Sequence, residues 1–240
     1  MKIGLTLLLL LSSSFGQGYN FQNLPFLGAG GPSLFPPGLY LRWIDRDLTN
    51  GSTVVWTDEI QSYNAVQTNA SIQPLMTSTG LVFATNHRLG FTNVNGNVAK
   101  YSFVFCVYYM SDPGSGQAVM FDDTGGFGNE SFVTTAGSPR WRQFQNGTGT
   151  FDVTGFIPTN TVVDFEAGTN LATAEVTYTN GVNDIVSGPA KFIGAALVNM
   201  GQVGATPFVV RELDYWTNIA ITATISSNLN YYRKITYGGN

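Results

Sequence analysis

Between Gly38 and Phe83 the chain repeats one pattern, in which a short run of apolar, β-branched and aromatic residues is followed by a cluster of turn formers. Trp43, Trp56 and Phe83 each stand inside such a run. Short runs at intervals of about ten residues, separated by Gly, Asn, Asp, Pro and Ser, are typical of all-β sandwiches and barrels. The same spacing continues toward the C-terminus, and helical periodicity is nearly absent. The pattern therefore predicts an all-β fold.

The order of features in this stretch is specific. The residues are a strand at Gly38–Asp45, a tight turn at Asn50–Ser52, a strand at Thr53–Asp58, a Gln-Pro loop at Gln73–Leu75 and a strand at Gly80–Phe83. This arrangement resembles the opening of the lectin/glucanase-like superfamily, which includes concanavalin A-like and laminin G-like domains. Near the C-terminus, Arg211–Trp216 followed by Tyr231–Lys234 is similar to the ending of the same family, although the stretch between the two is longer here. The resemblance implies an antiparallel jelly-roll β-sandwich and leaves the activity open, because it consists of structural positions.

Composition bounds the class of protein. With 240 residues and 43% hydrophobic content, the chain is long enough for one sizeable core, and we expect a single sandwich domain over residues 38–240. Only 11% of the residues are charged, against about 25% in an ordinary soluble domain. The formal net charge is -4 and no Lys/Arg cluster stands out, which argues against a nucleic-acid partner.

The N-terminus has the features of an export signal. Residues 1–16 combine a basic start at Lys2, a short apolar run to Leu11 and small residues up to Gly16, which predicts a signal peptide. The run is shorter than the roughly 20 apolar residues of a membrane span, so we expect no transmembrane segment after its removal. An uncleaved anchor or a buried N-terminal arm is the alternative. The predicted location is secreted, extracellular or on a particle surface.

Residues 17–37 are rich in Gly and Pro, which neither hold a helix nor pair as a central strand. We expect an extended arm whose apolar residues dock on a surface. That surface is either the chain's own sandwich or a neighbouring subunit, in which case the protein is a homo-oligomer or joins other structural subunits.

Later segments extend the all-β prediction. Tyr101–Tyr109 is apolar on both faces, as a strand buried between a partner sheet and a covering layer would be. Three further segments are predicted as strands with one solvent-facing side, namely Thr161–Glu166, Thr173–Tyr178 and Lys191–Leu197. Asn180-Gly181 predicts a hairpin turn. In the last segment, apolar residues at helical spacing around Ser226–Ile235 predict a short C-terminal helix.

The search for catalytic residues is negative. Glycoside hydrolases of the resembled superfamily carry Glu-x-Asp followed by a second Glu, and Glu212 and Asp214 match only the first half. Trp216 and Thr217 occupy the positions of the missing acid and cannot protonate a leaving group. We expect Glu212 to be a structural acid that hydrogen-bonds a neighbouring loop, and no enzymatic activity; a glycoside hydrolase is the less favoured alternative.

Other reactive residues are few. The single histidine, His87, is interpreted as a polar turn residue, and the single cysteine, Cys106, as a buried apolar one. No cofactor or zinc site is predicted. A calcium ion in the acidic Gly-rich loop is a weaker alternative, with Asp122, Asp123, Asn129 and Glu130 as candidate ligands.

A sugar site needs an exposed aromatic ring together with amides or carboxylates. If Arg140–Gln145 is a strand, Trp141, Gln143 and Gln145 share one face. Tyr63 and Asn64 form a second candidate site. Alternatively, Trp141 is half-buried against a loop or a subunit neighbour. The three other tryptophans lie among apolar strand residues and are predicted to be core.

Two functions fit these observations. The first is a secreted, non-catalytic, lectin-like module that binds carbohydrate or a surface glycan, or mediates adhesion. The second is a structural protein of a virion or of an extracellular fibre or layer, which assembles through its N-terminal arm. A nearly uncharged surface suits the second function because few charges must be desolvated at its contacts.

Overall fold

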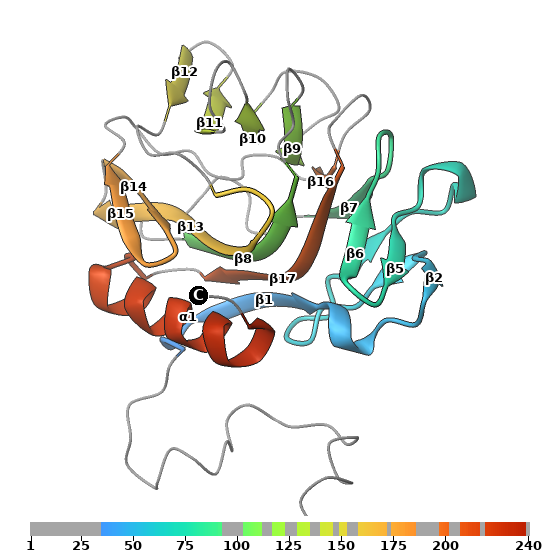
Figure 1. Cartoon of the computed structure of the whole chain (residues 1–240), viewed down its shortest axis with the longest axis horizontal. Coiled ribbons are helices and arrows are strands. Elements are labelled where there is room, and N and C mark those ends of the chain that lie inside the picture. The colour runs from blue at the N-terminus through green and yellow to red at the C-terminus, as the bar shows by residue number, and fades with distance from the viewer. Residues whose placement is uncertain are drawn as a thin grey trace, which may run out of the picture. The chain divides into compact units, whose positions relative to one another are not determined.

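A computed structural model of the chain describes residues 35–92, 103–111, 117–122, 129–134, 140–145, 149–152, 158–171, 174–185, 197–201, 207–216 and 219–238. All strand pairs among these residues are antiparallel, and they form two sheets that lie face to face (Figure 1). The predicted all-β sandwich with a short C-terminal helix is confirmed.

The first sheet has nine strands in the order β15-β14-β13-β8-β17-β6-β5-β2, with β1 paired to β17 beside this path. Its strands are β1 (Leu39–Ile44), β2 (Gly51–Ser52), β5 (Leu75–Thr77), β6 (Gly80–Phe83), β8 (Phe103–Met110), β13 (Val162–Leu171), β14 (Ala174–Thr179), β15 (Val182–Ile185) and β17 (Phe208–Trp216).

The second sheet has eight strands in the order β12-β11-β10-β9-β16-β7-β4-β3. Its strands are β3 (Val55–Trp56), β4 (Ala65–Val66), β7 (Leu89–Thr92), β9 (Gln117–Asp122), β10 (Asn129–Thr134), β11 (Arg140–Gln145), β12 (Gly149–Asp152) and β16 (Leu197–Met200). Two 3-10 turns, η2 (Asp45–Asp47) and η3 (Ala70–Ile72), and one helix, α1 (Ala223–Tyr237), complete the described elements.

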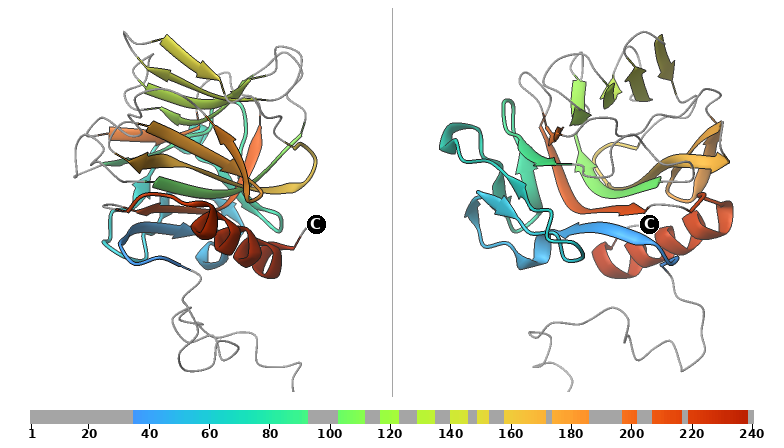
Figure 2. Two further views of the ribbon diagram at one scale, coloured as in Figure 1. Left: turned by 90° about the vertical axis from the view of Figure 1, so that its left-hand side faces the viewer. Right: turned by 180° about the vertical axis from the view of Figure 1, so that it is seen from behind.

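Strand β8 shows how the first sheet is buried on both sides. Its residues Val104, Cys106, Tyr108 and Met110 belong to the core between the sheets. The alternate residues Phe105 and Val107 are also fully buried, but on the other face. There they lie under α1, where the ring of Phe105 is 6.4 Å from that of Tyr232. The predicted two-faced burial of this segment is thus explained by a helix as the covering layer (Figure 2).

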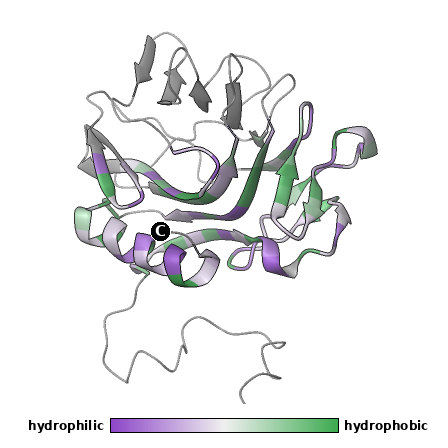
Figure 3. Ribbon diagram, in the orientation of Figure 1, coloured by the Kyte–Doolittle hydropathy of each residue, from purple (hydrophilic) through white to green (hydrophobic). Residues whose placement is uncertain are grey.

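The core between the sheets is aromatic. Trp43 packs against Trp56, with ring centroids 6.5 Å apart, and against Phe91 at 4.7 Å. Phe83 stacks on Phe208 at 5.0 Å. Trp43, Trp56 and Trp216 are at most 1% exposed, so the prediction that these tryptophans are core is confirmed. Strand β6, which ends at Phe83, has a hydrophobic colour in Figure 3.

Helix α1 begins after Thr222, whose side chain accepts a hydrogen bond from the backbone N–H of Ile225 at 3.3 Å. Its apolar residues at helical spacing dock it on the sheet, since Leu229 and Tyr232 are fully buried. Ile235, which continues the same spacing, is 54% exposed. The helix confirms the prediction and extends it at both ends.

Two predictions near the N-terminus are corrected in detail. Gly51–Ser52 is not a tight turn but the short edge strand β2, which pairs with β5. The expected strand at Thr53–Asp58 shortens to Val55–Trp56 in the other sheet. The chain passes from the first sheet to the second at Thr53 and Val54. The sequence pattern of Thr53–Asp58 does not show this crossing, so it predicted one longer strand.

The predicted solvent-facing side of β13 is wrong. Residues Val163 to Gly168 are all buried, and the acids Asp164 and Glu166 are both 0% exposed. The physical reason is α1, which covers this face and supplies Arg233 and Ser226 as partners for the two acids. For β14 the described side chains Tyr178 and Thr179 are buried as well. Residues 191–196 of the third predicted strand lie outside the described residues.

The chain divides after Leu34, and the described residues all belong to the unit Phe35–Asn240. The predicted signal peptide and residues 17–34 of the predicted arm lie outside the described residues. The last residues of the arm are described: Trp216 Nε1 donates to the Pro36 carbonyl at 3.1 Å, and the Phe35 ring stacks on Trp216 at 6.0 Å. No helix in the described part of the chain is long and apolar enough to span a bilayer.

The predicted hairpin turn joins β14 and β15, and Asn180 and Gly181 have φ values of 51° and 78°. A Cβ at position 181 would lie 3.0 Å from Asn230 Nδ2 on α1.

We expect Gly181→Ala to lower the free energy of unfolding by about 1 kcal/mol, because alanine is strained at positive φ. Urea titration followed by tryptophan fluorescence measures this. Val182→Ala, which shortens a 64% exposed side chain in the same hairpin, is the control and should be tolerated. An unchanged midpoint for Gly181→Ala would contradict the role of the turn.

Candidate functional site

The first candidate sugar site lies on β11, in the second sheet. Trp141, Gln143 and Gln145 occupy alternate positions of this strand, opposite Val133, Ser131 and Asn129 of β10. The predicted strand is therefore present, and its backbone alternation places the three residues on one face. Their side chains lie outside the described residues, so the sugar platform stays a prediction.

The predicted calcium ligands flank a loop between β9 and β10. Asp122 ends β9, and Asn129 and Glu130 begin β10 in antiparallel register, with Glu130 opposite Asp122. Asp123 lies outside the described residues. Within the described part of the chain no three His, Cys, Asp or Glu side chains are grouped to hold a metal ion. The calcium hypothesis stays untested.

The loop that carries Tyr63 and Asn64 is organised by one carboxylate. Asp58 is 3% exposed, and its Oδ1 accepts from the backbone N–H groups of Arg42 and Ile60 at 2.8 and 3.1 Å. Its Oδ2 accepts from Gln61 and Tyr63 at 2.8 and 3.1 Å. This carboxylate closes residues 58–63 into a compact turn and ties it to β1, which explains the acid after Trp56 in the sequence.

This loop presents polar groups on its outer side. Asn64 Oδ1 accepts from the backbone N–H of Asp58 at 3.0 Å, so the N–H groups of its exposed amide are left as donors for a ligand. Tyr63 is half-buried, with its ring 6.1 Å from that of Tyr40. Burial and the neighbouring Tyr63 hydroxyl raise the pKa of Tyr40 to about 12. Tyr63 is thus held by neighbouring aromatic rings rather than standing free.

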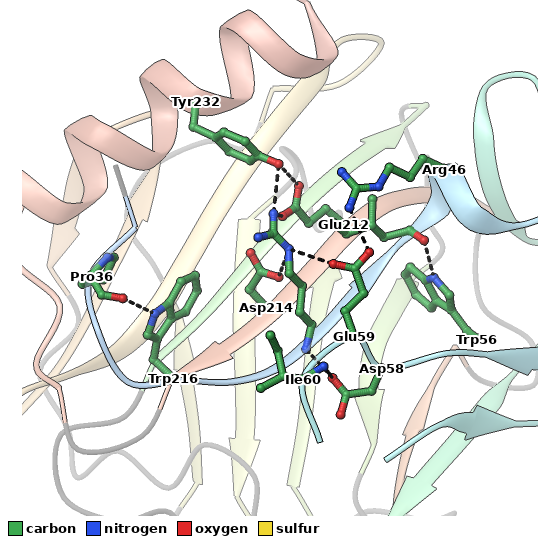
Figure 4. A network of polar contacts seen from close by, with 12 residues as sticks. Pro36, Arg46, Trp56, Asp58, Glu59, Ile60, Glu212, Asp214, Trp216 and Tyr232 are labelled. Atoms are coloured by element: carbon green, nitrogen blue, oxygen red, sulfur yellow. Dashed lines mark hydrogen bonds and ion pairs between the residues drawn. The ribbon is translucent and has the colours of Figure 1, made fainter. Parts of the chain in front are cut away.

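The most densely connected polar group in the described residues is buried under α1. Glu212 and Asp214, two residues apart on β17, share the face covered by the helix, as the sequence predicted (Figure 4). The guanidinium of Arg42, on the adjacent β1, lies between them: Nη2 is 2.5 Å from Glu212 Oε1 and Nε is 3.5 Å from Asp214 Oδ1. Both carboxyls are 0% exposed.

Helix α1 completes the Glu212 side of this group, which we call the Arg42 cluster (Arg42, Glu212, Asp214, Tyr232 and Tyr237). The hydroxyl of Tyr232 donates to Glu212 Oε2 at 2.9 Å, and that of Tyr237 donates to the same oxygen. Phe35 covers the cluster, with the Arg42 guanidinium 4.7 Å from its ring centroid. Glu212 therefore does hold structure, but it contacts a strand and a helix rather than the neighbouring loop that we expected.

A second group, the Arg233 cluster (Asp164, Glu166, Ser226 and Arg233), repeats this design on β13. Arg233 Nε on α1 donates to Asp164 Oδ1 at 2.9 Å, and Ser226 Oγ donates to Glu166 Oε2 at 3.1 Å. Arg233 also bonds Asn230 Oδ1 at 2.8 Å. All four members of the cluster are 0% exposed. Sequence reasoning missed this cluster, and the available signal was an Asp-x-Glu pair in a strand of a chain with few charges.

The pKa values in both clusters shift in one direction. Burial raises the pKa of the Asp214 carboxyl well above its ordinary value, and the negative charge of Glu212 raises it further. Burial and then the charge of Asp164 do the same for Glu166. Burial, followed by the charge of Glu212, also raises the pKa of the Tyr232 and Tyr237 hydroxyls. In each of these groups the raised pKa favours the protonated, uncharged form.

His87 and Cys106 play the predicted structural parts. His87 follows a turn at Thr85 and Asn86, and its Nδ1 accepts from the backbone N–H of Ala84 at 3.2 Å. Cys106 is 2% exposed, and burial raises the pKa of its thiol. A buried thiol of raised pKa is a poor nucleophile.

No protein-family model matches the chain, and no curated protein matches it either. Solved structures do share its fold. Trypanosoma rangeli sialidase superposes with a TM-score of 0.63 at 14% identity over 88% of this chain and 35% of the sialidase. The ligand binding domain of botulinum neurotoxin serotype D in complex with N-acetylneuraminic acid superposes with a TM-score of 0.62 at 12% identity over 82% of this chain and 51% of that chain.

These likenesses establish a shared fold and nothing finer, since the identities are so low. The chain spans about a third of the sialidase and about half of the toxin chain. They do correct one expectation. Absence of enzymatic activity was inferred from the missing second Glu, and the solved structures that share the fold include sialidases, which are glycoside hydrolases. The missing Glu is thus no ground for excluding an enzyme, because catalytic groups differ between proteins of one fold.

The Arg42 cluster is suited to holding structure. A tyrosine or carboxylate that attacks a substrate needs a lowered pKa and access to the substrate. Tyr232 and Glu212 are 0% exposed, and the pKa of Tyr232 is raised. The cluster fixes α1 and β1 on β17.

We expect Arg42→Met to lower the free energy of unfolding by about 3–5 kcal/mol, because it leaves Glu212 and Asp214 buried without a cation. Arg46→Met is the matched control. Arg46 pairs with Glu59 at 3.0 Å on the surface and should contribute about 0–1 kcal/mol. Chemical denaturation of the two variants measures the difference. Equal losses would show that burial of the Arg42 cluster does not matter.

We expect Asp58→Ala to lower the free energy of unfolding by about 2–4 kcal/mol, because four backbone N–H groups lose their acceptor. Asp58→Asn, which keeps one carbonyl oxygen, should lose less. Thermal unfolding of the two variants gives the comparison. If Asp58→Ala unfolds at the temperature of the unmodified protein, the turn is held by other contacts.

Proposed function

We propose that this chain is a carbohydrate-binding β-sandwich, a lectin-like module that recognises a glycan outside the cell or on a particle surface. The observation that carries the proposal is the shared fold with the toxin ligand binding domain, whose solved structure holds N-acetylneuraminic acid. A sialidase of the same fold has been solved with sialic acid. The resemblance of Gly38–Phe83 to concanavalin A-like domains supports the same class.

Strand β11 supplies the chemistry that a sugar needs. The backbone puts one indole, Trp141, and two amides, Gln143 and Gln145, in a row on one face of this strand. An indole stacks on the apolar face of a pyranose, and amides pair with its hydroxyls as both donors and acceptors. We therefore assign the sugar site to this face of β11.

The turn at residues 58–64 is the second candidate sugar site. It is rigid, because Asp58 holds its backbone from inside. It presents exposed Gln61 and Asn64 beside half-buried Tyr63. Ser62, at the tip, has a φ of 65°, and such backbone strain in non-glycine residues is common at binding sites.

A structural subunit that assembles through the N-terminal arm is a second candidate function. The observation in its favour is the anchoring of Phe35 and Pro36, which fixes where the arm leaves the sandwich. In this reading the chain is part of a homo-oligomer or of a larger layer. Light scattering of the protein with and without residues 17–34 distinguishes the two functions, because only assembly requires the arm.

We expect Trp141→Ala to abolish retention on a glycan array that includes sialosides, since loss of one stacking ring removes most of a weak sugar affinity. Arg142→Ala is the matched control, because its position on β11 faces the opposite side, and it should bind like the unmodified protein. Assaying the same sialosides for released sugar tests for hydrolysis. Equal binding by both variants would move the site to the Tyr63 and Asn64 loop, and no binding by the unmodified protein would contradict the proposal.

A further inference from the structure

The face of the first sheet that lies under α1 buries more acid than base. Four carboxyls lie there at 0% exposure, and two guanidiniums face them. The acids are Asp164, Glu166, Glu212 and Asp214, and the bases are Arg42 and Arg233. Strand β13 contributes Asp164 and Glu166, and strand β17 contributes Glu212 and Asp214. Each of these two pairs meets one arginine. A carboxyl taken out of water without a cation of its own keeps its proton, since the charged form is strongly disfavoured there.

In each pair the arginine lies closer to one acid than to the other. Arg42 Nη2 is 2.5 Å from Glu212, whereas its closest approach to Asp214 is 3.5 Å. Neither oxygen of Asp214 has a hydrogen-bond partner among the described residues. Arg233 is 2.9 Å from Asp164. Glu166 accepts from the Ser226 hydroxyl, and its Oε1 has no donor among the described residues. Two fully buried carboxyls thus have polar atoms that a proton would satisfy.

Every element packed around these two acids contributes to their environment. Around Asp214 the charged groups are Glu212 on β17, Arg42 on β1 and Glu59 in the loop between β3 and β4. The neutral titratable groups are Tyr232 and Tyr237 on α1 and Cys106 on β8. The Arg211–Asp45 pair lies next to Glu212. Around Glu166 they are Asp164 on β13, Arg233 on α1 and Tyr178 on β14. The arginines are already committed to Glu212, Asp164 and Asp45.

Helix α1 can leave the sheet without breaking strand pairing. It is the last element that the structure describes, and its hydrogen bonds to the sheet start from helix side chains, namely Ser226, Tyr232, Arg233 and Tyr237. All four donate to the acid pairs themselves: Ser226 to Glu166, Arg233 to Asp164, and both tyrosines to Glu212. An element held by side chains alone opens at lower free energy than the backbone-paired strands beneath it.

We propose that α1 is a proton-held latch, which stays docked while Glu166 and Asp214 are protonated and leaves the sheet when rising pH ionises them. Burial raises the pKa of both carboxyls in the docked state. The docked state therefore binds protons more tightly than the released state. The stabilisation of the docked state by these two protons is fully present below the ordinary carboxyl pKa and is lost as the pH rises through the raised pKa. Each proton shifts the equilibrium between docked and released helix by up to about tenfold per pH unit.

Hydrogen exchange of the backbone amides of residues 223–237 tests the latch in the full chain. Protection, corrected for the intrinsic exchange rate, is measured between about pH 5 and about pH 9 and is expected to fall as pH rises. Thiol labelling of Cys106, which is 2% exposed between the sheets, is followed in parallel. Exchange in α1 with Cys106 still unlabelled is the expected result. Labelling of Cys106 in step with α1 exchange would overturn the proposal, because the whole sandwich would then be opening.

Isosteric variants separate the latch from general alkaline destabilisation. Glu166→Gln and Asp214→Asn imitate the protonated acids, so each should remove about half of the pH dependence and the double variant nearly all of it. Each single variant suffices if the double variant does not fold. Asp152→Asn, which neutralises an acid on β12 at the far edge of the second sheet, is the control and should keep the dependence. Constant protection of α1 across this pH range, or unchanged pH dependence in both single variants, would overturn the proposal.

Discussion

The docking of α1 on the first sheet depends on how four buried carboxyls are neutralised. Arg42 reaches its pair from β1, at the N-terminal end of the sandwich, and Arg233 reaches the other pair from α1, at the C-terminal end. Because β8 lies between β13 and β17, the two clusters stand on either side of Phe105 and Val107, which α1 also covers. Buried ion pairs add little net stability, but a wrong alignment would leave charges unpaired. The clusters therefore define one position for the helix, and the apolar contacts supply most of the stabilising free energy.

This arrangement explains the composition. The sequence has 11 Lys and Arg in 240 residues, and two of the arginines are buried within one sheet face. Each of these buried acids needs a basic partner, and in both clusters the partner comes from an element distant in sequence. Arg42 and Glu212 are 170 residues apart, and Asp164 and Arg233 are 69 residues apart. The first and last thirds of the described domain must both be in place before the sheet face is neutral. Such long-range dependence favours cooperative folding of the domain as one unit.

The same distances explain what sequence reasoning could and could not reach. Local signals were enough for the strands at Leu39–Ile44 and Gly80–Phe83, for the Asn180-Gly181 turn and for a C-terminal helix, since each depends on neighbouring residues. The alternating pattern of Thr161–Glu166 wrongly predicted a solvent-facing side. No neighbouring residue in the sequence indicates that Arg233 covers Asp164. Glu212 and Asp214 were placed on one face correctly, yet the cation between them lies on β1 and could not be inferred from their spacing. For the sugar site, the β11 strand was predictable, whereas the ring environment that decides binding is a property of tertiary packing.

The proposed sugar site and the proposed latch lie on different sheets. Trp141 stands on β11 of the second sheet, whereas the carboxyl pairs stand on β13 and β17 of the first. A sandwich allows this separation because the strands of its two sheets are distinct. The sialidase and the toxin domain share this fold at 14% and 12% identity, so the fold tolerates replacement of most of its side chains. Proton release at the first sheet should therefore change the docking of α1 without altering the face of β11, so the two activities can be tested independently in one protein.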